Sequence, residues 1–285
     1  MGVIAVPRGE RSGSHRVVDV EVGDLREVIA ALAGVATLAR ASGVGPRALR
    51  ESLPELRASC IASPAIVANA LLPACDVVAL STGLAAEAHR AVDDLVAATR
   101  AAAARVHEVM DAIERKGLGA RTRLALQATC DRTAQELAHV RAAVELLQRA
   151  STSEPLPVAI EDVLRELDSG ERDGTHVELT VGGALDSSVA VQPRVASAVV
   201  LGALGRLHAL SPAPAFVAHA VDEGSRLVVE IRRRVATIVD PRFTVDVLVP
   251  HPAPFDAGVL RLAAATLAAP LEVSADRVRL ELLRV

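Results

Sequence analysis

Three histidines have the residue type and the surroundings to do chemistry: His89, His107 and His139. An imidazole on an exposed helix face can act as a nucleophile and accept a phosphoryl group. An aspartate follows two of them after about one helical turn, Asp93 after His89 and Asp111 after His107. A carboxylate in that position can orient the ring and raise its basicity. We rank His107 and His89 ahead of His139 as candidate phosphoacceptors, with a solvated helix-surface histidine as the alternative for each.

Other reactive groups form no recognisable site in the sequence. Cys60, Cys75 and Cys130 are an odd number of cysteines without a C-x-x-C pair, which is typical of a protein in a reducing cytoplasm. His208 and His219 have no cysteine or acidic cluster beside them, and the zinc-protease, serine-hydrolase and phosphate-loop motifs are absent. We expect no metal and no cofactor.

The element that must position His89 and His107 is the most regular part of the sequence. Apolar residues recur there at alternating steps of four and three, with one polar member, Thr99. This seven-residue repeat indicates a long helix with a narrow apolar seam. Each of the two histidines is one residue away from a seam position, so we expect both at the flank of the helix. The seam consists of Ala88, Val92, Leu95, Thr99, Ala102, Val106, Val109 and Ile113.

A second long helix is predicted over residues 122–150, where His139 lies next to the apolar Val140. The glycines of Lys116–Gly119 separate it from the first helix and permit a tight reversal. Two long amphipathic helices joined by a short loop predict an antiparallel hairpin over residues 81–150. Such a hairpin cannot bury its apolar stripe alone. We expect two hairpins to form a four-helix bundle across a dimer axis, with intrachain packing of residues 25–80 as the alternative.

Residues 1–80 are expected to form an N-terminal arm and a helical extension. The alternation in Val17–Val22 predicts a short strand. Helices are expected at 25–41, 46–57 and 64–80, the last interrupted around Pro64 and Pro73. The longest uncharged run, Ala58–Cys75, contains prolines and serines and much alanine, so we expect a buried helix rather than a membrane span.

Residues 151–285 have a different character and predict an α/β sandwich, a sheet with helices on one face. The whole chain is therefore expected to be an α+β protein, with a helical N-terminal part followed by this sandwich. The expected elements are an extended segment and helix within 156–167, strands at 176–181 and 188–191, a helix at 193–210, strands at 216–221, 226–232 and 243–249, a helix at 257–268, and a closing hairpin at 271–273 and 277–283.

This order of elements resembles the core of a two-component histidine kinase over about residues 82–285. The stretch Pro155–Leu164 resembles the entry to that family's ATPase fold, and the run from Gly258 to Leu282 resembles its last helix and hairpin. The resemblance implies a dimerising helical hairpin and an ATP-binding fold shared with gyrase and a heat-shock chaperone family. It also implies a receiver domain of the response-regulator type, or another signalling protein, as partner.

The nucleotide motifs that this resemblance implies have no counterpart here. The family's magnesium-binding helix carries an Asn, but the matching helix, Pro193–Leu210, contains none and places Gly205 or Leu201 at that point. The family's Asp-x-Gly at a strand end is replaced by Arg232–Arg234, and arginine cannot accept the hydrogen bond from adenine. Gly258 is isolated and does not form a glycine-rich lid. We therefore expect no ATP binding.

The histidines depart from the family as well. The family's phosphoacceptor is followed five residues later by proline, and the corresponding positions here are Asp94, Ala112 and Val144. The residues around His139 resemble the phosphoacceptor box, but that box belongs on the first helix of the hairpin.

Our first hypothesis is a non-catalytic, histidine-kinase-like signalling protein: a cytoplasmic homodimer acting as scaffold or docking partner. The alternatives are a histidine phosphotransferase using a hairpin histidine, a divergent active kinase, and an unrelated helical interaction protein. A formal net charge of −4 and the absence of Trp and Tyr disfavour nucleic-acid and anionic-membrane partners.

Overall fold

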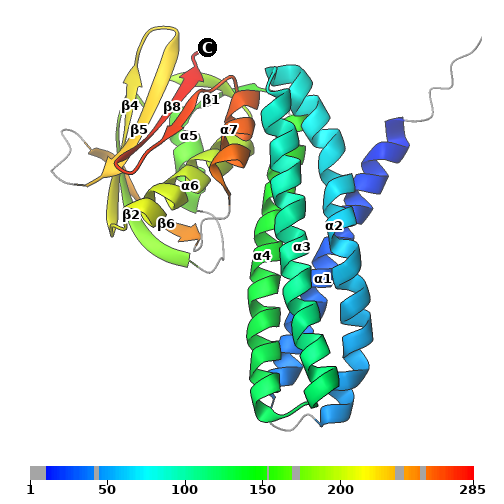
Figure 1. Cartoon of the computed structure of the whole chain (residues 1–285). Coiled ribbons are helices and arrows are strands. Elements are labelled where there is room, and N and C mark those ends of the chain that lie inside the picture. Colours follow the sequence, from blue (N-terminus) through cyan, green and yellow to red (C-terminus); the bar gives the residue numbers. More distant parts are fainter. Residues whose placement is uncertain (1–10, 42–44, 153, 169–173, 235–240, 251–254) are drawn as a thin grey trace, which may run out of the picture. The chain divides into compact units, whose positions relative to one another are not determined.

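A computed structural model describes residues 11–41, 45–152, 154–168, 174–234, 241–250 and 255–285 (Figure 1). The chain divides into two compact units. The first holds the residues up to Pro73 together with Val92–Val144, and the second holds Ala74–Ala91 together with Glu145–Val285. The first unit is helical, and the second contains the α/β sandwich. The predicted class, a helical N-terminal part followed by a mixed sandwich, is confirmed.

Four long helices run side by side as a bundle formed within one chain (Figure 1). They are α1 (Arg11–Arg40), α2 (Pro46–Thr82), α3 (Ala85–Lys116) and α4 (Ala120–Thr152). The short turn between α3 and α4 gives the antiparallel hairpin that the heptad pattern predicts. Gly117 ends α3 with φ +76°, and its N–H donates to the carbonyl of Ile113 at 2.7 Å.

In the first unit, ion pairs connect α1 and α2 to the helices of the hairpin. Arg40 of α1 lies 3.2 Å from Asp131 of α4, and Arg57 of α2 lies 3.0 Å from Asp111 of α3. Apolar side chains of α1 and α2 are buried along with the hairpin seam. Of the two arrangements that the sequence left open, intrachain packing of the residues before the hairpin is the one that the structure contains.

Two expectations for the N-terminal part are wrong. Residues 17–22, expected as a strand, belong to α1, because a helix once nucleated propagates at little cost into a flanking segment. The separate helices at 46–57 and 64–80 are one continuous helix, α2, that contains Pro54, Pro64 and Pro73. Each proline removes one hydrogen bond. The helix continues through these sites because one face is buried along its length.

Within the described residues, α2 is the one helix that is long and apolar enough, by length and composition alone, to cross a membrane. Its inner face is part of the bundle core, where Val67 and Val78 are fully buried. Its outer face exposes apolar side chains, with Ile61 at 64% and Leu80 at 88% exposure. The expectation of a buried helix therefore holds for one face of α2.

The sandwich contains a six-stranded sheet of order β6-β2-β4-β5-β8-β7 and a separate β1-β3 pair. Strands β2 and β4 are parallel, and the other neighbours in the sheet are antiparallel. The strands are β1 (Leu156–Ala159), β2 (Gly174–Gly183), β3 (Ser188–Val191), β4 (Ala215–Asp222), β5 (Arg226–Arg233), β6 (Pro241–Pro250), β7 (Leu271–Val273) and β8 (Arg277–Leu283). The helices are α5 (Ile160–Arg165), η1 (Glu166–Asp168), α6 (Pro193–Leu210) and α7 (Ala257–Thr266).

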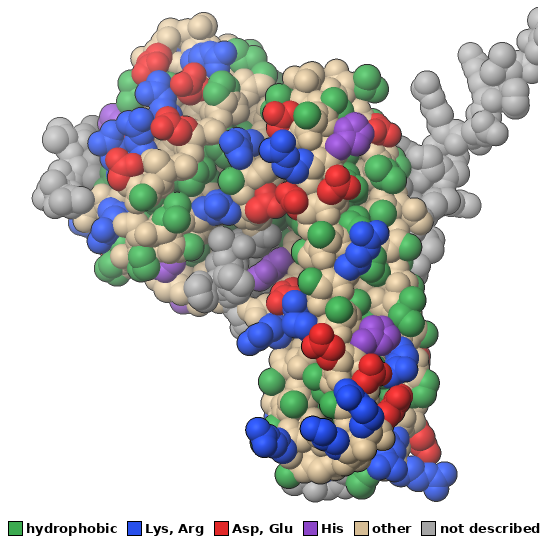
Figure 2. Space-filling model, in the orientation of Figure 1, with side chains coloured by type: hydrophobic (Ala, Val, Ile, Leu, Met, Phe, Trp, Pro, Cys, Tyr) green, Lys and Arg blue, Asp and Glu red, His purple; other side chains and the backbone are tan. Residues whose placement is uncertain are grey.

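The two faces of the sheet differ in character. Helices α5, α6 and α7 cover one face (Figure 1), and Val195, Val199 and Leu262 are fully buried there. The other face carries pairs such as Arg226 with Glu281, and Figure 2 shows basic and acidic side chains interleaved over it. The predicted sandwich with helices on one face is thereby confirmed.

Candidate functional site

The hairpin presents its histidines as the heptad pattern predicts, at the edge of a buried seam. All eight predicted seam positions are buried except Val109, which is half-buried. His89 is exposed, whereas His107 and His139 are half-buried. His89 belongs to the second compact unit and the other two histidines to the first.

His89 has the side-chain geometry that a nucleophilic imidazole needs. Its Nδ1 lies 2.7 Å from the carbonyl oxygen of Ala85, one turn earlier in α3. A carbonyl only accepts, so Nδ1 carries the proton and the lone pair is on Nε2. Nε2 is therefore the nucleophilic atom on an exposed side chain. The expected partner Asp93 makes no hydrogen bond to this ring among the described contacts.

His107 and His139 are less suited to the same chemistry. Asp111, expected to orient His107, instead pairs with Arg57 of α2 at 3.0 Å. Partial burial lowers the pKa of His139 below its ordinary value, because desolvation disfavours the charged imidazolium. Of the three sequence candidates, His89 is the one whose ring is both exposed and held in a defined tautomer.

The resemblance places a magnesium-binding helix at α6, and the Gly202 face of this helix contacts apolar side chains. A Cβ placed on Gly202 would lie 2.5 Å from Cδ2 of Phe255 and 2.7 Å from Cδ2 of Leu260. Phe255 and Leu260 are both buried. Gly205 is buried as well and offers no side-chain ligand. The space beside Gly202 is therefore occupied by apolar side chains rather than by polar groups.

The end of β5, where the resemblance places an adenine-binding aspartate, carries three exposed arginines that each have a partner. Arg232 lies 2.7 Å from Glu230 of the same strand. Arg233 donates to Oγ of Ser211 at 3.0 Å, and Arg234 pairs with Glu178 of β2. These guanidinium groups support neighbouring elements and are donors only, so they cannot accept from an adenine amino group.

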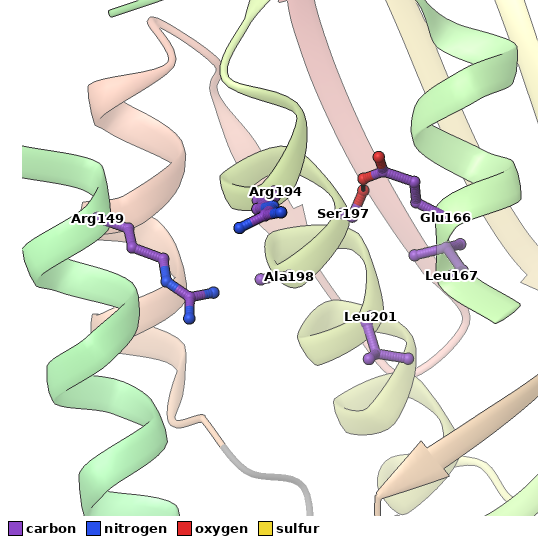
Figure 3. A pocket seen from close by; sticks show the side chains of 7 residues that line it. All are labelled: Arg149, Glu166, Leu167, Arg194, Ser197, Ala198 and Leu201. Carbon is purple, nitrogen blue, oxygen red and sulfur yellow. Dashed lines mark hydrogen bonds between the residues drawn. The ribbon is translucent and has the colours of Figure 1, made fainter. Parts of the chain in front are cut away.

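A pocket of about 350 Å³ lies in the second unit against the outer face of α6 (Figure 3). Arg149 of α4 and Arg194 of α6 extend toward one another, and Ser197 faces Glu166 (Figure 3). Oγ of Ser197 lies 3.1 Å from the carbonyl oxygen of Val163 and 3.3 Å from Oε2 of Glu166. The remaining residues that line the pocket are Leu167, Ala198 and Leu201.

The chemistry of this pocket is that of anion recognition. Arg194 is exposed and makes no ion pair among the described residues, and Arg149 lies 4.0 Å from Glu145. The sequence did not single out Arg149, Glu166 or Ser197, because they come from three elements that only the fold brings together. Two arginines beside a small apolar floor can hold a carboxylate or phosphate group on a partner.

Comparison with solved structures finds histidine kinases and a phosphotransferase among the matches. The Acinetobacter baumannii histidine kinase AdeS matches with TM-score 0.43 and 10% identity, covering 65% of this chain and 95% of that one. Full-length ShkA, solved with AMPPNP, matches with TM-score 0.38 and 13% identity, covering 65% of this chain and 42% of that one. A bacterial phosphotransferase matches with TM-score 0.24 and 16% identity, covering 64% of this chain and 88% of that one.

No family model and no curated protein matches the sequence. The chain itself consists of long helices followed by an α/β sandwich. At these identities and TM-scores the matches carry no conclusion about function, which is argued below from the residues of this chain.

Proposed function

We propose that this chain is a non-catalytic, two-component-type signalling protein that works without ATP and presents its helices to a receiver-type partner. The observation that carries the proposal is the packing of Phe255 and Leu260 on Gly202. Gly202 lies between Leu201 and Gly205, the two positions at which the resemblance would place the metal-binding Asn of a kinase. A buried apolar contact stabilises the sandwich but offers no ligand to a magnesium ion.

The end of β5 supports the same conclusion independently. A kinase of this type needs an acceptor for the adenine amino group at that strand end. Here Arg232 and Arg234 pair with Glu230 and Glu178, so the carboxylates nearby are already engaged. The sandwich is thus retained as a folded body whose contacts serve packing. Action as a cytoplasmic homodimer is part of the proposal.

The direct test is binding of nucleotide to the full chain. Thermal unfolding with and without magnesium and ATP should give the same melting temperature, because a ligand that binds only the folded state must raise it. A saturable rise of several degrees would contradict the proposal. Sedimentation equilibrium tests the homodimer separately, and a monomer at micromolar concentrations would remove that part alone.

Histidine phosphotransfer through His89 is the second candidate function, favoured by the bond between its Nδ1 and Ala85. In that reaction Nε2 attacks the phosphorus of an aspartyl phosphate on a receiver domain. The new N–P bond forms as the bond between phosphorus and the aspartate oxygen breaks, and the carboxylate leaves with the electron pair. The proton stays on Nδ1, where the Ala85 carbonyl stabilises the positive charge that the ring acquires.

Incubation with a receiver domain that carries labelled phosphate separates the two functions. Phosphotransfer predicts acid-labile label on this chain that disappears in His89→Gln and persists in His107→Gln. A scaffold predicts that the receiver binds equally well to wild type and His89→Gln, and that no label is transferred. Label that persists in a triple variant of His89, His107 and His139 would exclude all three candidates.

A further inference from the structure

The first compact unit contains a pocket of about 450 Å³ between the beginning of α2 and the end of α3. Four lining residues come from α2 and are spaced at positions i, i+3, i+4 and i+7. The other four have the same spacing and come from α3 and the glycine that follows it. One stripe from each helix therefore forms each wall. The lining residues are Arg50, Leu53, Pro54, Arg57, Met110, Ile113, Glu114 and Gly117.

The pocket is present because two of its positions carry little side chain. Pro54 places a compact ring where a longer side chain would reach across, and Gly117 places none. Gly117 has φ +76°, a conformation that other residues rarely adopt, so the end of α3 requires this glycine. The floor is apolar and rigid, since Leu53, Met110 and Ile113 are buried in the bundle core.

The two arginines of the pocket differ in charge compensation. Arg57 is held by two carboxylates, 3.0 Å from Asp111 and 3.1 Å from Glu114. Arg50 is exposed and makes no ion pair or side-chain hydrogen bond among the described residues. The carbonyl of Arg50 also lacks its usual helical donor, because Pro54 has no N–H. The pocket thus pairs an apolar floor with one uncompensated guanidinium.

The surroundings add to the positive potential. Between Glu114 and Asp131 the chain carries Arg115, Lys116, Arg121 and Arg123 and no acidic residue. Figure 2 shows basic side chains gathered at the end of the bundle where α3 turns into α4. A site with an apolar floor and an unpaired guanidinium at its edge attracts anions and retains those that also have an apolar part.

We propose that this pocket binds a small amphipathic carboxylate, with its apolar chain on Leu53, Met110 and Ile113 and its carboxylate on the guanidinium of Arg50. Arginine suits this role because its planar fork matches a carboxylate with two parallel hydrogen bonds. The site is distinct from the sandwich and from His89. A test of this proposal is therefore independent of the function proposed above.

Titration of the full chain with octanoate, octan-1-ol and octylammonium tests the proposal by calorimetry. Octanoate should bind saturably with one site per chain and raise the melting temperature. The alcohol and the ammonium, which share its chain but not its charge, should bind at least about tenfold more weakly. Equal binding of all three compounds, or no saturable binding of octanoate, would overturn the proposal.

Two variants and one matched control locate the site. Arg50→Gln should weaken the binding of octanoate at least about tenfold, because a charge-assisted hydrogen bond is lost. The matched control is Arg47→Gln, three residues earlier in α2. Arg47 is paired with Glu51 at 2.8 Å, so this variant loses the same charge but should leave the affinity for octanoate unchanged. Equal losses in Arg50→Gln and Arg47→Gln would show that only net charge matters, which contradicts the proposal.

Pro54→Leu tests occupancy of the pocket in a protein that must remain folded. The leucine side chain enters the cavity, and the helix regains a backbone hydrogen bond. We expect a melting temperature at or above that of wild type together with loss of octanoate binding. Unchanged octanoate affinity in this variant would place any binding site elsewhere.

Discussion

The ring of Phe255 lies against Gly202 so closely that a Cβ at Gly202 would stand 2.5 Å from its Cδ2. This contact joins α6 to Phe255, which lies two residues before the start of α7. Glycine in the middle of a helix normally costs stability. At this position it permits a close approach of an aromatic ring.

Gly202→Ala should destabilise the chain by about 1–3 kcal/mol, because the added methyl group overlaps Phe255 and Leu260 in a packed core. The matched control is Gly34→Ala in α1, where no heavy atom lies within 4 Å of the new Cβ. That variant should gain about 0.5–1 kcal/mol from helix propensity. Urea unfolding measures both, and a stabilising Gly202→Ala would show that the contact is loose.

The sequence predicts the sandwich and the hairpin well because their signals are local. Alternation and turn residues place α6 at Pro193–Leu210 and the closing hairpin at β7 and β8 with the observed bounds. The heptad seam places His89 and His107 at the edge of a buried stripe. Local patterns of this kind survive in the fold because tertiary contacts reinforce them.

The parts that sequence could not predict depend on which surfaces meet. A narrow apolar stripe looks the same whether it packs on a second chain or on α1 and α2. The prolines of α2 indicate breaks, yet burial of one helix face outweighs the lost hydrogen bonds. The pocket between α2 and α3 draws its residues from Arg50 to Gly117, and the pocket on α6 draws its residues from Arg149 to Leu201. Each is built from separate elements, so no local motif marks it.

Thr133 of α4 places its hydroxyl in the bundle core without a hydrogen-bond partner among the described residues. Thr133→Val keeps the shape and removes the unsatisfied group, so stability should rise by about 1 kcal/mol. Thr99 of α3 is equally buried, but its Oγ1 donates to the Leu95 carbonyl at 2.8 Å. Thr99→Val should lower stability by up to about 1 kcal/mol. Equal effects in the two variants, measured by thermal unfolding, would count against the unpaired hydroxyl.

The three cysteines should be chemically silent in the folded protein. Burial raises the pKa of Cys60 and Cys75 to about 11 and that of Cys130 to about 12, so the reactive thiolate is scarce at neutral pH. A chromogenic disulfide reagent should label none of them in native protein and all three in denaturant. Rapid labelling of native protein would show that the bundle opens readily.

These raised pKa values also predict a loss of stability at high pH. The folded state keeps its thiol protons above the ordinary pKa of 9.0, whereas the unfolded state releases them. The contribution to stability is therefore complete below that pH and declines as the pH rises toward about 11. Replacement of Cys60 by alanine should flatten this decline, although it also lowers stability at every pH by leaving a cavity.

His139 predicts a second pH dependence, on the acid side. Burial lowers the pKa of its ring in the folded state, so the unfolded state binds the proton more readily. The stability that neutral His139 contributes is present above its ordinary pKa of 6.5 and is lost as the pH falls through that value toward the folded-state pKa. His139→Gln should therefore show a smaller drop in melting temperature between about pH 7.5 and about pH 5.5 than wild type. His89→Gln is the matched control, because it replaces a histidine whose side chain is exposed. If both variants reduce the drop equally, burial of His139 is not its cause.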